Sequence, residues 1–187
     1  MKTLQYRVLS LALLALLVWV LAGTSASFAM GVPQIQYLSH EEFLQQAFPA
    51  GEPHWKMLML KPPVRKEVEA ILGHPYPGSR LRYWQAGQRT AWILDEVGKD
   101  LPITLGVVID QDQIVQVNVL VYREERGGEI HEDFFTRQFH QVTLGAAGEL
   151  SKPIDGITGA TLSVNAVTRV ARLVLALHQR VVASSAH

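Results

Sequence analysis

A glycine-rich segment near the C-terminus has the residue types needed to bind a phosphate. It reads D-G-I-T-G-A-T and spans residues 155–161. Gly156 and Gly159 permit backbone angles closed to other residues, and together with Ala160 they let a bulky group approach the main chain. Thr161 presents a hydroxyl ahead of a predicted helix, where N–H groups lack partners and the helix dipole favours negative charge. The segment therefore predicts a phosphate site.

A simpler interpretation of this segment is an ordinary loop in which Thr161 or Ser163 caps the helix. Threonine and serine are common caps, worth about 1 kcal/mol. Of the two rival hydroxyls, Thr158 is expected to form a turn and Ser163 to cap the helix. The Gly-Lys-Ser/Thr sequence of a nucleoside triphosphate loop is missing, so that class of ligand is not expected.

The elements that position this segment follow from hydrophobic periodicity. Four stretches rich in β-branched or aromatic residues are separated by short gaps of turn formers, which predicts an antiparallel meander. Four further stretches have helical spacing or helix start and stop signals. The predicted strands are 80–85, 90–97, 103–109 and 114–122, and the predicted helices are 39–48, 62–72, 130–139 and 163–182. The fold class expected is α+β, an antiparallel meander sheet packed with short helices and a long C-terminal helix.

The N-terminal residues have the pattern of an export signal. Lys2 and Arg7 precede an apolar run at 8–22, and small residues lead to a cleavage site after Ala29. We expect a signal peptide at 1–29, a helical segment at 30–79 and the domain core at 80–187. The alternative is an uncleaved anchor at 8–22 in the inner membrane. Either case predicts a periplasmic or extracytoplasmic protein.

Composition excludes several classes of function. The chain has 187 residues, no cysteine and a formal net charge of zero. Thiolate metal sites and iron–sulfur clusters are therefore excluded, and no nucleic-acid partner is expected. The seven histidines show no ligand spacing, so no metal site is expected. No nucleophile elbow or catalytic cysteine is present, so no catalytic residue is predicted.

The segment Asp155–Thr161 resembles the Asp-x-x-Ser/Thr-Gly-Ala-Thr flavinylation signature of the FMN-binding domain family. This family includes the C subunit of sodium-translocating NADH:quinone reductase and the G subunit of the Rnf complex. The resemblance implies that a flavin transferase attaches FMN covalently, through a phosphoester, to Thr161. A phosphoester there would place its remaining negative charge at the start of the long helix.

The resemblance covers roughly residues 80 to 182. Residues 107–130 resemble the family's strand, turn and strand before the attachment loop. Within them, residues 122–128 keep the family's glutamate and a glycine pair but lack its Thr-Pro-Gly. The candidate cofactor-binding residues are Tyr122, Glu124, Asp155, Gly156, Thr158, Gly159, Ala160, Thr161, Leu162 and Ser163. The aromatic residues Tyr83, Trp84 and Trp92 could stack on a flavin, or belong to the core or sheet surface.

The function implied is an exported electron-transfer protein that carries FMN between a membrane donor and an extracytoplasmic acceptor. Its expected partners are the flavin transferase and membrane electron-transport proteins or cytochromes. An acid beside a phosphate is unfavourable without a cation, so Asp155 is expected to serve the transferase, through a divalent metal during attachment. Two alternatives stay open: a flavoreductase acting on a small acceptor such as a ferric chelate or quinone, and a module that binds FMN reversibly or not at all.

Overall fold

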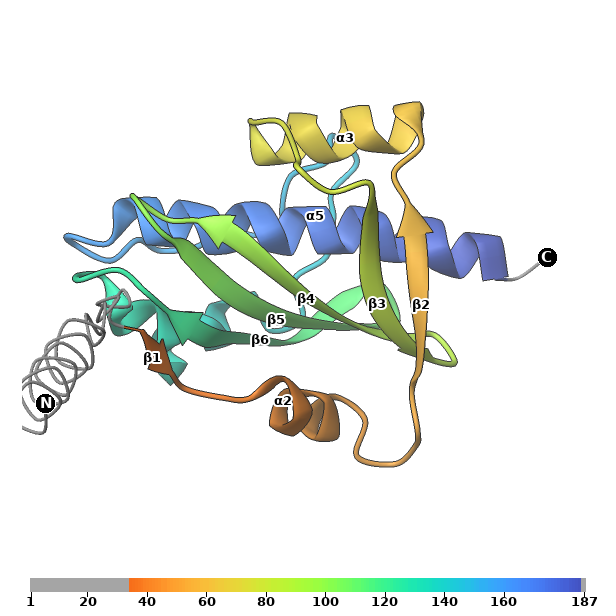
Figure 1. Ribbon diagram of the computed structural model, residues 1–187, viewed down its shortest axis with the longest axis horizontal. Helices are drawn as coiled ribbons and strands as arrows, with labels where there is room; N and C mark the ends of the chain where they lie inside the picture. Colours follow the sequence, from red (N-terminus) through yellow and green to blue (C-terminus); the bar gives the residue numbers. More distant parts are fainter. Residues whose placement is uncertain (1–33, 186–187) are drawn as a thin grey trace, which may run out of the picture. The chain divides into compact units, whose positions relative to one another are not determined.

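A computed structural model describes residues 34–185, and these residues lie within one compact unit, Pro33–His187. The predicted signal segment 1–29 falls outside the described residues. The elements in chain order are β1 (Ile35–Gln36), α2 (His40–Ala47), β2 (His54–Met59), α3 (Pro62–Leu72), β3 (Arg80–Ala86), β4 (Arg89–Val97), β5 (Pro102–Asp110), β6 (Gln113–Tyr122), η1 (Gly128–His131), α4 (Asp133–Thr136), η2 (Arg137–Phe139) and α5 (Thr161–Ser185). The α+β fold class is confirmed (Figure 1).

One sheet contains all six strands, in the order β1-β6-β5-β4-β3-β2, and every neighbouring pair is antiparallel. The four predicted strands are confirmed as β3 to β6. Tight turns join them: Gly87 has φ +60° between β3 and β4, and Gln111 and Asp112 have φ +50° and +61° between β5 and β6. Such left-handed residues are what two-residue hairpin turns require.

Strands β1 and β2 form the two edges of the sheet and were not predicted. β1 has only two residues, and β2 is exposed or half-buried throughout, so neither shows alternating burial. A strand without a clearly buried face gives little periodic signal. Both lie in the segment 30–79, for which only helices were predicted.

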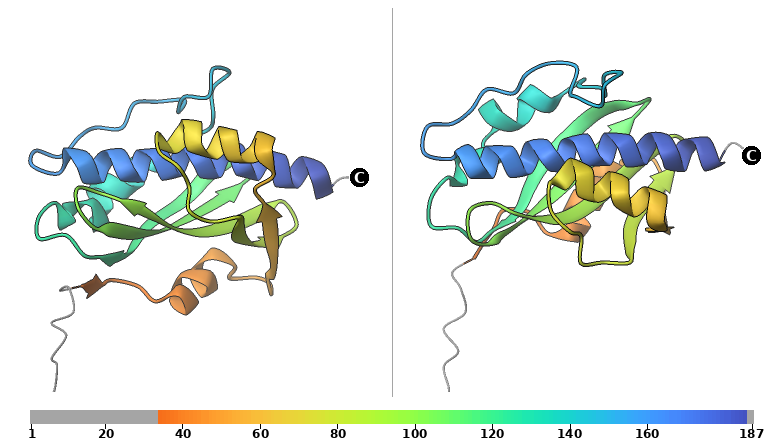
Figure 2. Two further views of the ribbon diagram at one scale, coloured as in Figure 1. Left: turned by 45° about the horizontal axis from the view of Figure 1, so that its top comes forward. Right: turned by 90° about the horizontal axis from the view of Figure 1, so that it is seen from above.

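Helices cover both faces of the sheet. Helices α3 and α5 lie side by side on one face, over the larger hydrophobic core, and α2 covers a smaller core on the other (Figure 2). Gly106 of β5 lets α2 approach closely, because a Cβ atom there would stand 2.6 Å from the ring of Phe43. Because α5 packs on the larger core, this long helix is fixed against the sheet along its buried side.

Local sequence signals explain where the first two helices begin and end. Ser39 and Glu42 form the predicted capping box of α2. Helix α3 begins at Pro62 and ends before Gly73, which has the left-handed conformation expected of a C-cap glycine. Both predicted helices are confirmed.

The predictions for residues 130–139 and for α5 need correction. The first stretch is three short pieces, η1, α4 and η2, and Phe134 is 62% exposed although we predicted it on the buried side with Phe135 and Phe139. Helix α5 begins at Thr161, two residues before the predicted start at Ser163. Among the described residues, no helix is both long enough and apolar enough to cross a bilayer.

Candidate functional site

A cavity of about 560 Å³ lies at the start of α5, and we call it the α5 cavity. Three segments line it: the turn between β4 and β5, the loop after β6, and the first residues of α5. Its lining residues are Lys99, Asp100, Leu101, Glu124, Glu125, Arg126, Gly159, Ala160, Thr161, Leu162 and Ser163. The fold therefore brings Glu124 together with three predicted residues of the glycine-rich segment, Gly159, Ala160 and Thr161, and with the two that follow them, Leu162 and Ser163. The other four candidates, Tyr122, Asp155, Gly156 and Thr158, do not line the cavity.

The N-terminus of α5 presents unpaired N–H groups to this cavity. The first helical hydrogen bond runs from the Val164 N–H to the Ala160 carbonyl, at 2.9 Å. The N–H groups of Thr161, Leu162 and Ser163 precede it and make no hydrogen bond within residues 34–185. Ala160, directly before the helix, has no side-chain oxygen with which to cap it. An anionic group at this position would satisfy these donors and interact favourably with the helix dipole.

Ser163 does not cap the helix as predicted. It is the third residue of α5 and only 4% exposed, and its Oγ lies 3.2 Å from the hydroxyl of Tyr122. The helix begins earlier because Thr158 and Gly159 form a turn closed by the Ala160 N–H to Ile157 carbonyl hydrogen bond, at 3.0 Å. The turn directs the chain into the helix at Thr161, so Thr161 is exposed at its first position.

Tyr122 stands behind the cavity and joins two of its walls. Its hydroxyl donates to the carbonyl of Arg126 in the loop after β6, and it accepts the hydroxyl proton of Ser163 in α5. Burial raises the pKa of Tyr122 above its ordinary value, so the phenol stays neutral and keeps the proton that it donates. Tyr122, predicted to bind the cofactor, therefore fixes the loop to the helix.

Glu124 organises the turn between β4 and β5. Its Oε1 accepts the backbone N–H groups of Lys99, Asp100 and Leu101, at 2.7, 2.8 and 3.0 Å. Partial burial raises the pKa of Glu124, but these hydrogen bonds and the Lys99 charge outweigh burial, so the pKa lies below its ordinary value. The carboxylate holds the turn in place as one wall of the cavity.

We expect Glu124→Gln to loosen this turn. A neutral amide oxygen is a weaker acceptor than a carboxylate, so hydrogen exchange at the amides of Lys99, Asp100 and Leu101 should accelerate roughly fivefold. In the wild type the protection should be present above the unfolded-state pKa of about 4.3 and be lost as the pH falls through the lower folded-state pKa. The neighbouring Glu125→Gln is the control, and equal acceleration in both variants would contradict this role.

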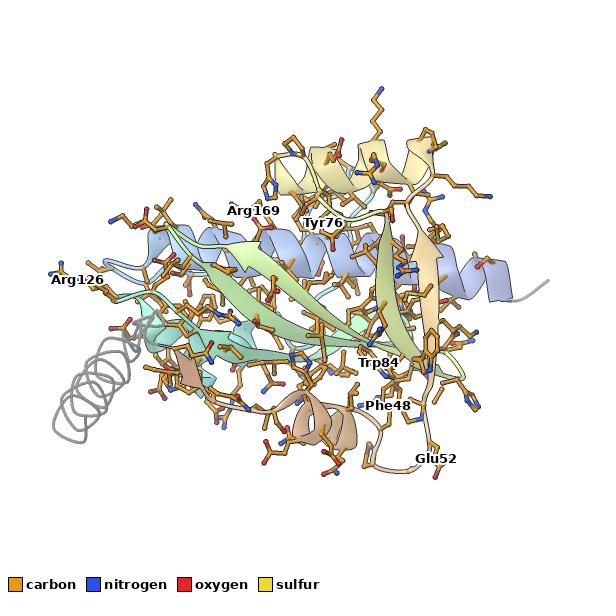
Figure 3. The ribbon with its side chains drawn as sticks, viewed as in Figure 1. Phe48, Glu52, Tyr76, Trp84, Arg126 and Arg169 are labelled. Carbon is orange, nitrogen blue, oxygen red and sulfur yellow. The ribbon has the colours of Figure 1, made fainter. Side chains whose placement is uncertain are left out.

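The remaining charges of the α5 cavity are mixed. Lys99 Nζ lies 3.5 Å from Asp100 Oδ2, so these two charges compensate each other. Arg126 and Glu125 make no ion pair among the described residues, and Figure 3 shows Arg126 at the end of the domain where α5 begins. Leu162 adds a 49% exposed apolar side chain. The α5 cavity thus combines backbone N–H donors, a guanidinium without an ion pair and an apolar surface. A phosphorylated aromatic cofactor requires this combination.

The two glycines of the segment have different roles. Gly159 has φ +83°, a conformation that other residues adopt only with strain, whereas Gly156 has no left-handed φ and no atom within 4 Å of a Cβ built on it. Both glycines permit such backbone angles, but of the two only Gly159 has a left-handed φ. Gly159→Ala should lower the free energy of unfolding by about 1–2 kcal/mol, and Gly156→Ala should leave it nearly unchanged. Equal urea midpoints for the two variants would contradict this assignment.

Asp155 is held through its backbone. Its N–H donates to Oε1 of Gln138 at 2.7 Å, and Nε2 of Gln138 donates to its carbonyl at 3.5 Å. The carboxylate is exposed and has no partner among the described residues. Asp155 therefore precedes the lining residues in the sequence but does not itself line the cavity.

Several residues of the site were not predicted from the sequence. Lys99, Asp100, Leu101, Glu125 and Arg126 line the cavity, and Gln138 holds the segment. The only sequence feature that marked the lining residues was their position in or next to predicted turns. The aromatic candidates prove to be structural: Tyr83 and Trp92 stack in the core with centroids 4.7 Å apart, and Trp84 packs against the smaller core. Within the described residues, no three His, Cys, Asp or Glu side chains lie close enough to hold a metal ion.

Comparison with known proteins assigns the cofactor class. Residues 98–176 match the FMN-binding domain family. No curated protein and no solved structure matches the chain. The matched residues run from the β4–β5 turn into α5 and contain every residue that lines the α5 cavity. At residues 98–176, the chain therefore contains a member of the FMN-binding domain family.

Proposed function

We propose that the chain carries FMN in the α5 cavity, joined by a phosphoester to Thr161, and that it transfers electrons outside the cytoplasm. One observation supports this most strongly. Thr161 is exposed at the first position of a helix whose free N–H groups have no capping side chain, in the wall of a cavity within an FMN-binding domain. A phosphate on its hydroxyl would be stabilised there by the helix N-terminus.

The chain's own residues would bind and orient the cofactor. The N–H groups of Leu162 and Ser163 are free to donate hydrogen bonds to phosphate oxygens, and Arg126 supplies a positive charge at the same cavity. Leu162 offers apolar contact to the ring portion. FMN supplies the electron-transfer chemistry, while the protein holds it and limits its access to solvent.

Attachment requires a second protein, a flavin transferase, to reach the segment. Residues 155, 158, 159 and 161 are exposed, so this side of the loop is accessible. We propose that the unpaired carboxylate of Asp155 serves the transferase by binding a divalent cation during transfer. Asp155→Ala should then slow attachment without changing the stability of the domain, and normal flavinylation of Asp155→Ala would contradict that role.

Export from the cytoplasm would explain why the flavin is bound covalently. A flavin that dissociated outside the cytoplasm would be lost by diffusion, so a tether keeps the carrier loaded. The partners we propose are membrane electron-transport proteins or cytochromes, with electrons passing from a membrane donor to an extracytoplasmic acceptor. The apolar run at 8–22 would either direct export and be removed, or stay as an anchor.

Denaturation tests the covalent bond directly. The protein, purified after coexpression with a flavin transferase, is unfolded in guanidinium chloride and passed through a desalting column. We expect flavin absorbance and fluorescence to elute with the polypeptide. Flavin that elutes separately would show reversible binding and overturn the proposed attachment.

A further inference from the structure

The sheet is split between its two neighbouring strands β3 and β4. Their pairing extends from Ala86↔Arg89 only to Tyr83↔Trp92, although β3 starts at Arg80 and β4 continues to Val97. Figure 1 shows the two strands diverging beyond the paired residues. A cavity of about 410 Å³ occupies this split, and we call it the β3–β4 cavity.

The β3–β4 cavity lies between the strands and not on one face of the sheet. It is lined by the consecutive residues 80–82 of β3 and 93–97 of β4. Consecutive residues of a strand point to opposite faces, so only an opening within the sheet can touch all of them. In an antiparallel hairpin the two residues that flank a two-residue turn form a hydrogen-bonded pair. Every second pair along the two strands is then hydrogen-bonded in the same way. By this alternation the backbone groups of Arg80 and Asp95 point into the split, whereas Arg82 and Ile93, next to the last pair Tyr83↔Trp92, form its closed end.

The inner side of this cavity, facing α3 and α5, is apolar with one compensated charge. Leu81 and Leu94 are 2% and 6% exposed there, beside Tyr76. Glu96 is 3% exposed, and its carboxylate accepts hydrogen bonds from Arg169 at 2.6 Å and from His74 at 3.1 Å. Figure 3 shows Tyr76 and Arg169 on the side of α3 and α5. The inner side therefore favours an apolar side chain.

The outer side, which α2 does not cover at this end, is basic. Arg80 and Arg82 are exposed, and Arg80 has no partner among the described residues. The guanidinium of Arg82 lies over the ring of Trp55, 5.8 Å from its centroid. Asp95 is the acid that lines the cavity on this side, and its Oδ1 already accepts a hydrogen bond from the hydroxyl of Thr104 at 2.6 Å. The outer side therefore favours an acidic side chain.

We propose that an extended segment of a partner protein, alternating apolar and acidic residues, inserts between β3 and β4 as an additional strand. Such a segment would pair with the unpaired backbone edges of both strands, place its apolar side chains against Leu81 and Leu94, and place its acidic side chains beside Arg80 and Arg82. A simple anion would meet the arginines but leave the backbone edges unpaired. Strand β4 leads directly into the turn at Lys99, so the partner would bind beside a wall of the α5 cavity.

Peptide binding to the flavin-free protein tests this proposal independently of FMN attachment. The probes are acetyl-Glu-Val-Glu-Val-Glu-amide, its lysine counterpart, and an acidic version N-methylated at its valines. Binding is followed through the backbone amide signals of Arg80 and Asp95 in ¹⁵N-labelled protein. We expect the acidic peptide to shift both signals and to bind roughly tenfold more tightly than the basic one, and the N-methylated peptide not to bind.

Charge-reversed variants complete the test. Arg80→Glu should remove the preference for the acidic peptide, and Lys66→Glu, an exposed charge reversal on α3 away from the cavity lining, should keep it. The proposal is overturned if the acidic peptide does not bind, if both peptides bind equally to the wild type, or if the N-methylated peptide binds as well as the parent. It is also overturned if free glutamate shifts the same two signals to the same extent.

Discussion

Gly127→Ala is expected to lower the free energy of unfolding by about 2–4 kcal/mol, from backbone strain and overpacking together. Gly127 has φ +87°, and a Cβ atom there would stand 3.1 Å from the Cβ of Ala160 and 3.1 Å from the hydroxyl of Tyr122. Any relief of these contacts must move the loop after β6 away from α5. We therefore also expect reduced FMN attachment, measured as the flavin-to-protein ratio beside a urea unfolding curve.

Gly148→Ala is the matched control for this prediction. Gly148 has φ +81°, nearly the same backbone conformation, but no atom lies within 4 Å of a Cβ built on it. This variant should show only the strain, about 1 kcal/mol, and should load with FMN normally. Equal losses of stability in the two variants would mean that the contact between Gly127 and Ala160 does not hold the cavity walls together.

Arg169→Ala is expected to lower the free energy of unfolding by about 2–4 kcal/mol, since it leaves a buried carboxylate without its main partner. The Glu96 side chain is 2% exposed and accepts hydrogen bonds from Nε and Nη2 of Arg169, at 3.1 and 2.6 Å. Arg169 also donates to the carbonyl of Val97, at the end of β4. The arginine side chain is itself 30% exposed, so we take a value below that of a fully buried pair.

The loss of stability in Arg169→Ala should depend on pH, because His74 also contacts Glu96. Nδ1 of His74 faces the carbonyl of Pro75 and Nε2 faces Glu96, and both acceptors raise the pKa of the histidine. A raised folded-state pKa stabilises the fold below the unfolded-state pKa of about 6.5, and this is lost as the pH rises through the folded value. Arg169→Ala should therefore be more destabilised at pH 8 than at pH 6. Arg172→Ala is the control, because among the described residues the Arg172 side chain donates only to the carbonyl of Gly148. Equal losses of stability in the two variants would contradict the role of Glu96.

The parts of the fold that were predictable are those with a strong local signal. Strands β3 to β6 alternate or are continuously apolar between turn residues, and α3 has proline at its start and Gly73 after its end. Strand β2 was not predictable, because its stability comes from pairing with β3 and not from a buried face of its own. The start of α5 was misplaced because a serine in a helix start resembles a cap, whereas Ser163 contacts Tyr122, a residue 41 positions away.

The site was predictable in its chemistry but not in its surroundings. Residues 155–161 carry a local pattern, and the turn and helix start that it indicates are present at Gly159 and Thr161. The turn residue Lys99 lies at the same cavity as this segment because its N–H donates a hydrogen bond to Glu124, which is 25 positions away in the chain. Contacts of this kind depend on tertiary packing, so a single sequence leaves no pattern for them. The same reason explains why the hydrogen bonds from the turn to Glu124 were not predicted.

The identity of the modified residue is tested most directly by the intact mass of the protein after coexpression with a flavin transferase. Wild type is compared with Thr161→Ala and with Thr158→Ala, which removes the neighbouring hydroxyl of the turn. We predict that wild type and Thr158→Ala each gain the mass of one FMN less one water, and that Thr161→Ala gains nothing. Modification of Thr161→Ala, or its loss in Thr158→Ala while Thr161 is present, would contradict attachment at Thr161.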